Sequence, residues 1–565
     1  MDKYGVKSTY DAITNRLLDY INTEYLGKND ALRMACEKEL QRVGTVFQEP
    51  YIEANPAYLE VVDGLRQADL AEDVKNILLK MAERKLGVFK NPYKHQLEAL
   101  EAFYNGQDLF VATGTGSGKT ECFMWPMVSK LVLESMHSPE TWEIRGVRAI
   151  MLYPMNALVS DQLGRFRRMI GNEENVFHSL LNEMAPGRRV PQFGMYTGRT
   201  PYSGRAEGTQ NRDLADTIEK DILGQPKEVK EKLRELGKYP SKKDLAAFVQ
   251  RLRRQENDLT DPMDAELITR HEMHQYCPDI LITNYSMLEY MLMRPIEKDI
   301  WRKTRSWLDS DQGHKLLFVI DEAHMYHGSS GGEVALLVRR LLHKLGISRS
   351  QVQFILTSAS VPPEKEEEIR QFACDLSAQR VDENKFILIK GTEEEIREKG
   401  KEFDPKVLAD YDMDALQQEW SQWYPAILDF AGRVGVPISF NLEDEKTVGI
   451  WLYDCLRRCA PMQRIMEHTR GHAVSFQELV KRAFPQGQLS EAEKATSVLL
   501  AVAPLAKNAE GKVLFQPGCI CCFGDCRGFM PAPIRPVPRK VMRVRSWDWG
   551  GFICESPVRV VNVAV

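Results

Sequence analysis

The sequence predicts an α/β fold: a parallel sheet with helices on both faces and a phosphate loop at one edge, preceded and followed by mainly helical segments. Three observations predict it. A glycine-rich run, VATGTGSGKTE, fills residues 111–121 between an apolar segment and a helical one. The apolar run LLFVIDEAH at residues 316–324 ends in two carboxylates, and the run at residues 352–360 ends in small hydroxyl residues. Continuous apolar runs of this kind are typical of parallel strands buried on both faces.

The glycine-rich run has the residue types that a nucleotide phosphate requires. Glycines let the backbone curl so that successive N–H groups face the phosphates, Lys119 supplies a positive charge, and the Thr120 hydroxyl ligates Mg²⁺. Thr113 stands where the strict pattern has glycine. The residues predicted to bind the nucleotide in this loop are Thr115, Gly116, Ser117, Gly118, Lys119 and Thr120.

The two carboxylates after the second run are the predicted catalytic groups, together with Lys119. Asp321 would hold the Mg²⁺ of the nucleotide, and Glu322 would orient or deprotonate the attacking water. The alternative is a strand end with ordinary surface carboxylates. The third run ends in Thr357, Ser358, Ala359 and Ser360, and we expect the last three to couple the nucleotide site to a second ligand.

These motifs together resemble those of superfamily 2 helicases, with Asp-Glu-Ala-His as the second motif and Ser-Ala-Ser as the third, over roughly residues 85–400. The resemblance implies a RecA-like domain that binds ATP and Mg²⁺. Gln96, in NPYKHQLEAL, stands where these helicases place a glutamine that reads the adenine edge. It could instead cap its helix or face solvent.

Three further segments resemble the strand-contact motifs of this superfamily: residues 153–162, 196–199 and 278–285. The first could be an ordinary strand end turned by proline, and the second a generic turn. The sequence of residues 283–295 and 321–341 is similar to that of bacterial MrfA-like helicases, which carry a C-terminal zinc-binding domain. This resemblance implies DNA as the partner. The implied nucleic-acid contacts are Pro154, Asn156, Gln162, Thr197, Gly198, Thr283 and Asn284.

The composition of the chain limits which class of protein it can be. The chain has 565 residues, of which 43% are hydrophobic and 27% charged, and its net charge is −5. No apolar run approaches the roughly 20 residues that cross a bilayer, and the N-terminus lacks a secretory apolar segment, so we expect a cytoplasmic protein with no membrane partner. Six of the eleven cysteines are scattered, as reduced thiols are, and five lie near the C-terminus.

Breaks in pattern predict the domains. Residues 1–85 form a helical accessory segment, and residues 86–400 form the RecA-like domain, with a charged insertion at about 203–270. The insertion is either a DNA-guiding arm or, as we favour, a solvated helical hairpin with ion pairs four residues apart. Residues 401–515 are helical, and residues 474–515 have the pattern of a winged-helix unit that either touches DNA or only packs.

The rest of the chain predicts an incomplete motor. A second RecA-like domain would supply an arginine finger, yet residues 361–565 contain only DFAGRVGV, a partial match to its motif. From residue 517 the apolar periodicity disappears. If the codons of residues 517–538 are read in the frame that begins at the third base of each codon, suitable wobble bases give an amino-acid sequence that resembles the start of the family's zinc module. We therefore hypothesise a frameshift near Gln516 and a disordered tail at 517–565, rather than a zinc site at Cys519, Cys521, Cys522 and Cys526.

Two functions follow. The chain is either the N-terminal motor lobe of an ATP-dependent DNA helicase or translocase, or a nucleotide- and DNA-binding lobe that does not hydrolyse ATP until a second chain supplies the missing domain. As an isolated chain we expect it to have low or no ATP hydrolase activity, because the arginine finger contributes about 10³–10⁵ of the rate.

Overall fold

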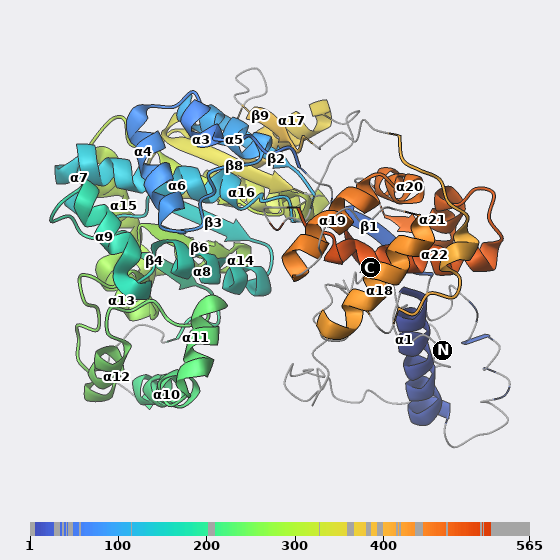
Figure 1. Ribbon diagram of the computed structural model, residues 1–565. Coiled ribbons are helices and arrows are strands. Elements are labelled where there is room, and N and C mark those ends of the chain that lie inside the picture. The colour runs from blue at the N-terminus through green and yellow to red at the C-terminus, as the bar shows by residue number, and fades with distance from the viewer. Residues whose placement is uncertain are drawn as a thin grey trace. The chain divides into compact units, whose positions relative to one another are not determined.

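The structure is a computed structural model that describes residues 6–26, 34, 36, 39–40, 42, 49–55, 58–114, 116–201, 209–326, 328–358, 366–379, 386–392, 399–413, 416, 420–435, 444–469, 473–508, 511 and 513–520. The chain divides into two compact units (Figure 1). One comprises Tyr58–Thr392, and the other combines Met1–Ala57 with Glu393–Val565.

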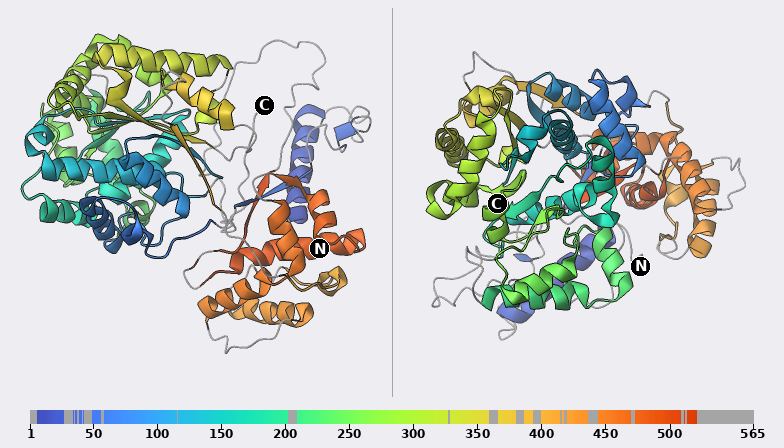
Figure 2. Two further views of the ribbon diagram at one scale, coloured as in Figure 1. Left: turned by 90° about the horizontal axis from the view of Figure 1, so that it is seen from above. Right: turned by 90° about the vertical axis from the view of Figure 1, so that its left-hand side faces the viewer.

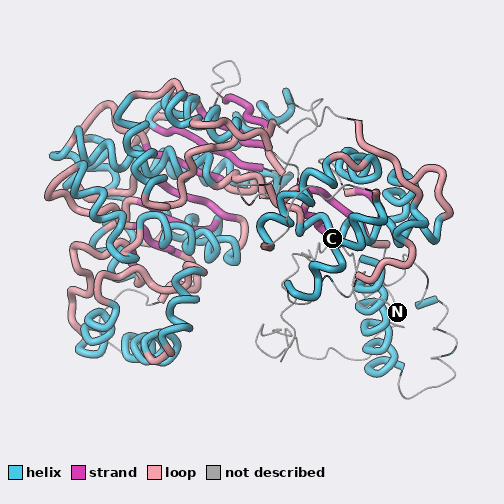
Figure 3. Tube along the Cα trace, viewed as in Figure 1, coloured by secondary structure: helices cyan, strands magenta, loops and turns pink. Residues whose placement is uncertain are grey.

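The unit Tyr58–Thr392 is built on one eight-stranded sheet in which every pair of neighbours is parallel, in the order β5-β4-β6-β3-β7-β8-β2-β9. The strands lie side by side through the middle of the unit (magenta in Figure 3). Their bounds are β2 Asp108–Ala112, β3 Ala149–Tyr153, β4 Phe193–Tyr196, β5 Glu266–Leu267, β6 Ile280–Asn284, β7 Leu316–Ile320, β8 Val352–Ser358 and β9 Phe386–Lys390. The predicted fold class is confirmed.

Successive side chains of each strand enter two different cores, because a strand presents alternate residues to opposite faces. In β2, Leu109 and Val111 join the core on one face, whereas Phe110 and Ala112 join the core on the other. Both faces are apolar, so the strands appear in the sequence as continuous apolar runs.

Helices cover each face of this sheet (Figure 2). One face is covered by α4 Glu72–Glu83, α5 Lys94–Tyr104, α6 Glu121–His137, α7 Pro139–Glu143, α8 Asn156–Ile170 and α9 Val176–Met184. The other is covered by α13 Arg270–Tyr276, α14 Tyr285–Met293, α15 Lys298–Asp309, α16 Gly328–Leu345 and α17 Glu366–Leu376. The short α3 Gly64–Gln67 precedes α4.

The insertion forms a helical unit of its own, seen below the sheet in Figure 1. It contains α10 Thr209–Ile218, the π-helical turn η3 Glu219–Leu223, α11 Lys227–Glu235 and α12 Leu245–Arg254. Residues of α10 and α12 share a small core that includes Ile218 and Phe248, whereas α11 buries no residue. Lys227 and Glu231 on α11 pair at 3.7 Å, which is the ion pairing predicted for a solvated hairpin; whether the insertion guides DNA stays a prediction.

The unit boundaries differ from the predicted domain boundaries. Residues 58–85, expected in the N-terminal accessory segment, belong to the sheet-containing unit because the apolar stripe of α4 (Val74, Ile77, Leu78 and Met81) packs into its core. At the other end the unit stops at Thr392 rather than residue 400. Within residues 1–85, which were predicted to be helical, α1 Val6–Ile21 and α4 are helices, whereas residues 51–55 form a strand.

The second unit is mainly helical, with a three-stranded antiparallel sheet in the order β10-β1-β11. Its elements are α1, η1 Asn22–Leu26, β1 Tyr51–Asn55, η9 Pro405–Leu408, α18 Trp420–Val434, α19 Glu445–Arg457, α20 Ala460–His468, β10 Val474–Ser475, α21 Phe476–Ala483, α22 Leu489–Val502, η11 Ala503–Leu505 and β11 Gln516–Ile520. Two helices flanked by short antiparallel strands fit the predicted winged-helix pattern, with β1 contributed from near the N-terminus.

The prediction that the disordered tail begins at residue 517 is wrong. Residues 517–520 form most of β11 and pair with β1, Pro517 opposite Ala54 and Ile520 opposite Tyr51, because main-chain pairing needs no particular side chains. Residues 521–565 lie outside the described residues, as do the side chains of the proposed cysteine cluster. The frameshift itself stays a hypothesis.

Two further findings concern membrane-spanning helices and cysteines, and both apply to the described residues only. None of the helices there is both long and apolar enough to cross a membrane. The six scattered cysteines are free thiols, and five of them are buried.

Candidate nucleotide and nucleic-acid site

One edge of the sheet collects all the predicted motifs, because the carboxyl ends of parallel strands meet at the same edge. The strand order divides that edge into two halves. The phosphate loop follows β2, Ser358 ends β8, and Asp321 and Glu322 follow β7, so the nucleotide motifs lie on three adjacent strands. The predicted strand contacts follow β3, β6 and β4, the next three strands along.

The phosphate loop has the backbone that its glycines predict. Gly116 and Gly118 have φ values of 76° and 77°, in the region that residues with a side chain rarely adopt. A Cβ at Gly118 would lie 2.2 Å from Gln96 Nε2, so another residue there would displace the Gln96 side chain and strain the backbone. Thr113 replaces the first glycine of the strict pattern, and its buried hydroxyl lies 2.6 Å from Ser117 Oγ, across the loop. Thr115 lies outside the described residues.

The lysine of the loop contacts the acid of β7. Lys119 Nζ lies 3.3 Å from Glu322 Oε1, and both side chains are largely buried. Glu322 has φ 51° and ψ 47°, a left-handed conformation of the kind that is stored at functional sites. These residues lie 203 positions apart in sequence, and the structure brings them together.

Asp321 is held by the strand next to it. The Thr357 hydroxyl of β8 donates a hydrogen bond to Asp321 Oδ1, which also accepts from the Glu322 N–H at 3.1 Å. Burial raises the pKa of Asp321, and the Thr357 hydrogen bond opposes that shift. The sequence places Thr357 among the small hydroxyl residues at this strand end that could relay to a second ligand, but only the β7–β8 pairing shows its partner.

Thr120 and Asp321 are the predicted Mg²⁺ ligands, and their chemistry fits that ion. Both are 8% exposed or less, and a hydroxyl with a carboxylate supplies the hard oxygen donors that Mg²⁺ takes alongside nucleotide phosphates and water. No group of three or more His, Cys, Asp or Glu side chains in the described part of the chain could hold a metal, which is compatible with a site that needs one carboxylate.

A histidine links the second motif to the third. His324 Nδ1 lies 3.3 Å from Ser358 Oγ and 3.3 Å from Glu322 Oε2. Ser358 therefore reaches the carboxylate of Glu322 through one side chain, that of His324; its coupling role stays a prediction. Ala359 and Ser360, the other predicted coupling residues, lie outside the described residues.

Gln96 caps its own helix. Its Oε1 accepts from the Tyr93 N–H at 2.9 Å and its Nε2 donates to the Gly118 carbonyl at 3.1 Å. The side chain is 2% exposed. Capping was one of the alternatives considered; reading of adenine stays a prediction.

The predicted strand contacts differ in exposure. Pro154, Gly198 and Asn284 reach the surface, and Asn284 caps α14 by accepting from the Met287 N–H at 2.8 Å. Thr197, Thr283 and Gln162 are buried, at 1%, 0% and 6%. Thr283 donates to the Tyr196 carbonyl at 2.7 Å, so it ties β6 to β4. The side chain of Asn156, at the start of α8, lies outside the described residues.

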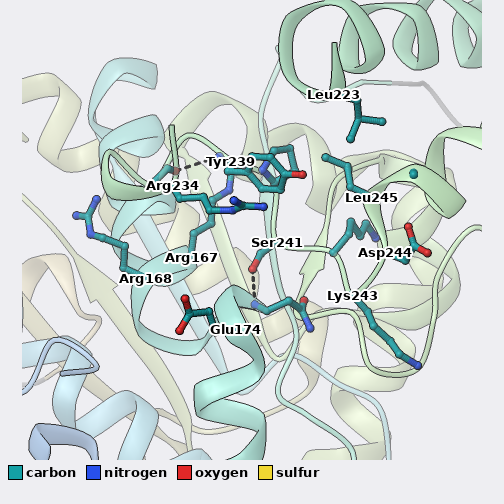
Figure 4. A pocket seen from close by; sticks show the side chains of 15 residues that line it. Arg167, Arg168, Glu174, Leu223, Arg234, Tyr239, Ser241, Lys243, Asp244 and Leu245 are labelled. Atoms are coloured by element: carbon teal, nitrogen blue, oxygen red, sulfur yellow. Dashed lines mark hydrogen bonds between the residues drawn. The ribbon is translucent and has the colours of Figure 1, made fainter. Parts of the chain in front are cut away.

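A basic pocket of about 520 Å³ lies between α8 and the insertion (Figure 4). Arg167 and Arg168 line it from α8, and Arg234 lies 4.4 Å over the Tyr239 ring. Three of its basic side chains form ion pairs: Arg167 with Glu266, Lys242 with Asp264 and Lys243 with Asp261. The pocket therefore lies where the insertion packs against α8.

The sheet, the loop and the paired carboxylates define a RecA-like ATP-binding domain of the helicase type. Residues 93–193 and 227–369 match the model of the DEAD/DEAH box helicase family. The matched residues all lie in the unit Tyr58–Thr392, which is therefore similar to the DEAD/DEAH box helicases of superfamily 2.

Among curated relatives, the chain is 38% identical over 571 residues to the Druantia protein DruE of Escherichia coli (strain UMEA 4076-1), covering 93% of this chain and 30% of that protein. It is 25% identical over 288 residues to the uncharacterized ATP-dependent helicase YprA of Bacillus subtilis (strain 168), covering 51% of this chain and 25% of that one. A crystal structure of the helicase MrfA bound to DNA is similar with a TM-score of 0.33 and 18% identity, over 61% of this chain and 30% of that chain. The chain thus spans about a third or less of the length of these proteins.

Proposed function

We propose that this chain carries the first motor lobe of an ATP-dependent DNA helicase or translocase. The single observation that carries this proposal is the division of one sheet edge into a nucleotide half (β2, β8, β7) and a strand-contact half (β3, β6, β4). Adjacent halves let hydrolysis at one end change the contacts at the other.

Each side chain then has a role. Lys119 binds the nucleotide phosphates, Thr120 and Asp321 hold Mg²⁺, and Glu322 positions the attacking water. When bound, Mg²⁺ neutralises charge on the phosphates. Ser358 and His324 transmit the change from the Glu322 carboxylate towards β8.

The strand contacts come mainly from backbone and exposed side chains, since Thr197 and Thr283 are buried. Pro154, Gly198 and Asn284 are at the surface, and Arg199, exposed beside Gly198, offers a phosphate contact. Phosphate contacts of this kind bind a strand without reading its sequence. DNA as the substrate rests on the resemblance of residues 283–295 and 321–341 to MrfA-like helicases.

One observation favours the second candidate, a lobe that binds but does not hydrolyse. Within the described ranges the only parallel sheet is that of Tyr58–Thr392, so an arginine finger from a second such sheet is not among those residues. Another part of a longer chain or a second chain would then supply it.

The test combines ATP binding, strand binding and turnover. We expect the chain to bind labelled ATP with Mg²⁺, and to bind single-stranded DNA more tightly than RNA of the same sequence. Arg199→Ala should weaken strand binding and reduce the salt slope by about one, whereas Arg302→Ala, an exposed arginine on α15, should not. Strong DNA-stimulated hydrolysis by the chain alone would overturn the second candidate, whereas binding without turnover would support it. Absence of ATP binding would overturn both.

A further inference from the structure

An aromatic cluster packs against the outer side of the phosphate loop. It consists of Tyr58, before α3, and of Tyr93 and His95, at the start of α5. The Tyr58 ring centroid lies 5.1 Å from that of His95 and 5.8 Å from that of Tyr93, and the rings of Tyr93 and His95 stack at 5.5 Å. Tyr58 is 4% exposed and His95 is fully buried. Three aromatic rings thus form a rigid support beside the loop.

The cluster holds the loop at both ends. Tyr58 Oη accepts a hydrogen bond from the Gly114 N–H at 3.0 Å, and His95 Nε2 lies 2.9 Å from the Ser117 carbonyl oxygen. A carbonyl only accepts, so His95 must donate its Nε2–H. Its Nδ1 is buried with no hydrogen-bond partner among the described residues. This geometry selects the neutral imidazole with the proton on Nε2.

The direction of the Ser117 carbonyl decides where the next amide points. The C=O and N–H of one trans peptide unit point in opposite directions. Because His95 draws the Ser117 carbonyl outward, the N–H of Gly118 is turned to the opposite side, the inner side of the loop. Gln96 holds the Gly118 carbonyl in the same way, so the N–H of Lys119 is turned inward too. Two successive amides are therefore oriented from outside the loop.

We propose that His95 is a positioning residue for nucleotide phosphate: its Nε2–H fixes the Ser117–Gly118 peptide so that the Gly118 N–H faces the phosphate, while Tyr58 fixes the beginning of the loop. The proposal rests on the proposed function, since it takes ATP as the ligand of this loop. Burial lowers the pKa of His95 to about 4, which keeps the imidazole neutral at physiological pH.

Substitutions that keep or remove the donor test this role. His95→Gln places an amide N–H donor at comparable reach, and His95→Leu removes the donor while filling similar space. We expect His95→Leu to weaken binding of labelled ATP and Mg²⁺ by about 5- to 30-fold, the range for one lost hydrogen bond with a misdirected amide. His95→Gln should bind within about threefold of the wild-type chain. Tyr58→Phe should weaken binding by about fivefold.

A matched control separates positioning from packing. His274 is a half-buried histidine whose pKa burial likewise lowers to about 4, but it bonds Tyr196 in the other half of the sheet. His274→Leu should lower the melting temperature and leave ATP affinity unchanged. Equal weakening by His95→Gln and His95→Leu, or no weakening by His95→Leu, would overturn the proposal.

The tautomer is measured without nucleotide. Nitrogen NMR of the full chain with labelled histidine, assigned through the loss of one signal in His95→Gln, should show a protonated Nε2 and an unprotonated Nδ1 at neutral pH. The reverse tautomer would overturn the positioning role even if ATP binds. Failure of the wild-type chain to bind ATP, with the expected tautomer observed, would overturn the proposed function and leave the loop orientation standing.

Discussion

Lys119 Nζ and Glu322 Oε1 are 3.3 Å apart across the carboxyl edge of the sheet. The lysine comes from the loop after β2 and the glutamate from the end of β7, with β8 between the two strands. The pair balances the lysine charge, so nucleotide phosphates must compete with a carboxylate for the same ammonium group. Four predictions follow from this pair and from three other buried contacts.

Neutralising the glutamate should tighten nucleotide binding. Glu322→Gln removes both the competitor for Lys119 and a negative charge near the phosphates, so we expect ATP affinity to rise by about 3- to 10-fold, as for a partly exposed ion pair. Lys119→Met should have the opposite effect, a loss of about 10-fold or more. Anisotropy of labelled ATP measures both, and Lys227→Met on exposed α11 should change neither. Weaker binding by Glu322→Gln would contradict the competition.

Removing the Thr357 hydroxyl should destabilise the sheet edge. Thr357→Val keeps the shape but leaves Asp321 without its side-chain donor, and a hydrogen bond to a charged group contributes about 1.5–3 kcal/mol. Urea denaturation should show a loss of this size. Ser358→Ala removes a hydroxyl that contacts a half-exposed histidine, so its effect should be smaller. Equal losses in the two variants would argue against a special role for Thr357.

Asp279 should be among the most sensitive positions of the fold. It is fully buried just before β6, accepts from Arg189 at 2.7 and 2.8 Å, and lies 3.3 Å from Arg148. The two guanidinium groups hold the pKa of Asp279 below its ordinary value despite burial. Asp279→Asn leaves Arg189 without its counter-charge, whereas Arg148 keeps Glu134 at 2.8 Å, and we expect unfolding to become easier by about 3–5 kcal/mol. Asp309→Asn, which breaks only an exposed pair, should cost about 0.5 kcal/mol or less. A loss from Asp279→Asn as small as that of the control would refute the prediction.

Acid should destabilise the wild-type chain more than His95→Gln. The folded-state pKa of His95 is about 4, below its ordinary 6.5, so between these values the unfolded chain binds a proton that the folded chain does not. Stability from His95 is therefore complete above pH 6.5 and is lost as the pH falls towards 4. The free energy of unfolding of the wild-type chain, relative to that of His95→Gln, should fall by about 2–3 kcal/mol between about pH 7 and pH 4.5. Urea denaturation at several pH values measures it, and a constant difference would contradict the shift.

Much of the fold could be predicted because its signals are local. The apolar runs of β2, β7 and β8 mark buried strands, and the spacing of Val74, Ile77, Leu78 and Met81, all four of which are buried, marks α4. The boundary at Tyr58 could not be predicted, because it depends on which core α4 packs against. The same holds for residues 517–520, whose pairing with β1 involves a strand more than 450 positions away.

The candidate site shows a similar division. The phosphate loop and the Asp321–Glu322 pair follow from motif and order along the chain. The contacts of Tyr58 with Gly114 and of Thr357 with Asp321 join residues from different elements, and no local pattern signals them. The place of His95 next to Gln96 in the sequence could have indicated a role at this site, but its complete burial could not be predicted from the sequence. The burial of Thr283 and Gln162 likewise reflects neighbouring strands and helices.

The sequence by itself determined the chemistry of this protein: which residue types follow which strands, and hence the phosphate, metal and acid groups of a DEAD/DEAH box helicase domain. Only the tertiary structure decided which of those groups meet. The order β4-β6-β3-β7-β8-β2 places the nucleotide motifs on three adjacent strands and the strand-contact motifs on the next three. The physical reason is that strand order is set by pairing and burial between distant segments, whereas residue chemistry is already present in each segment alone.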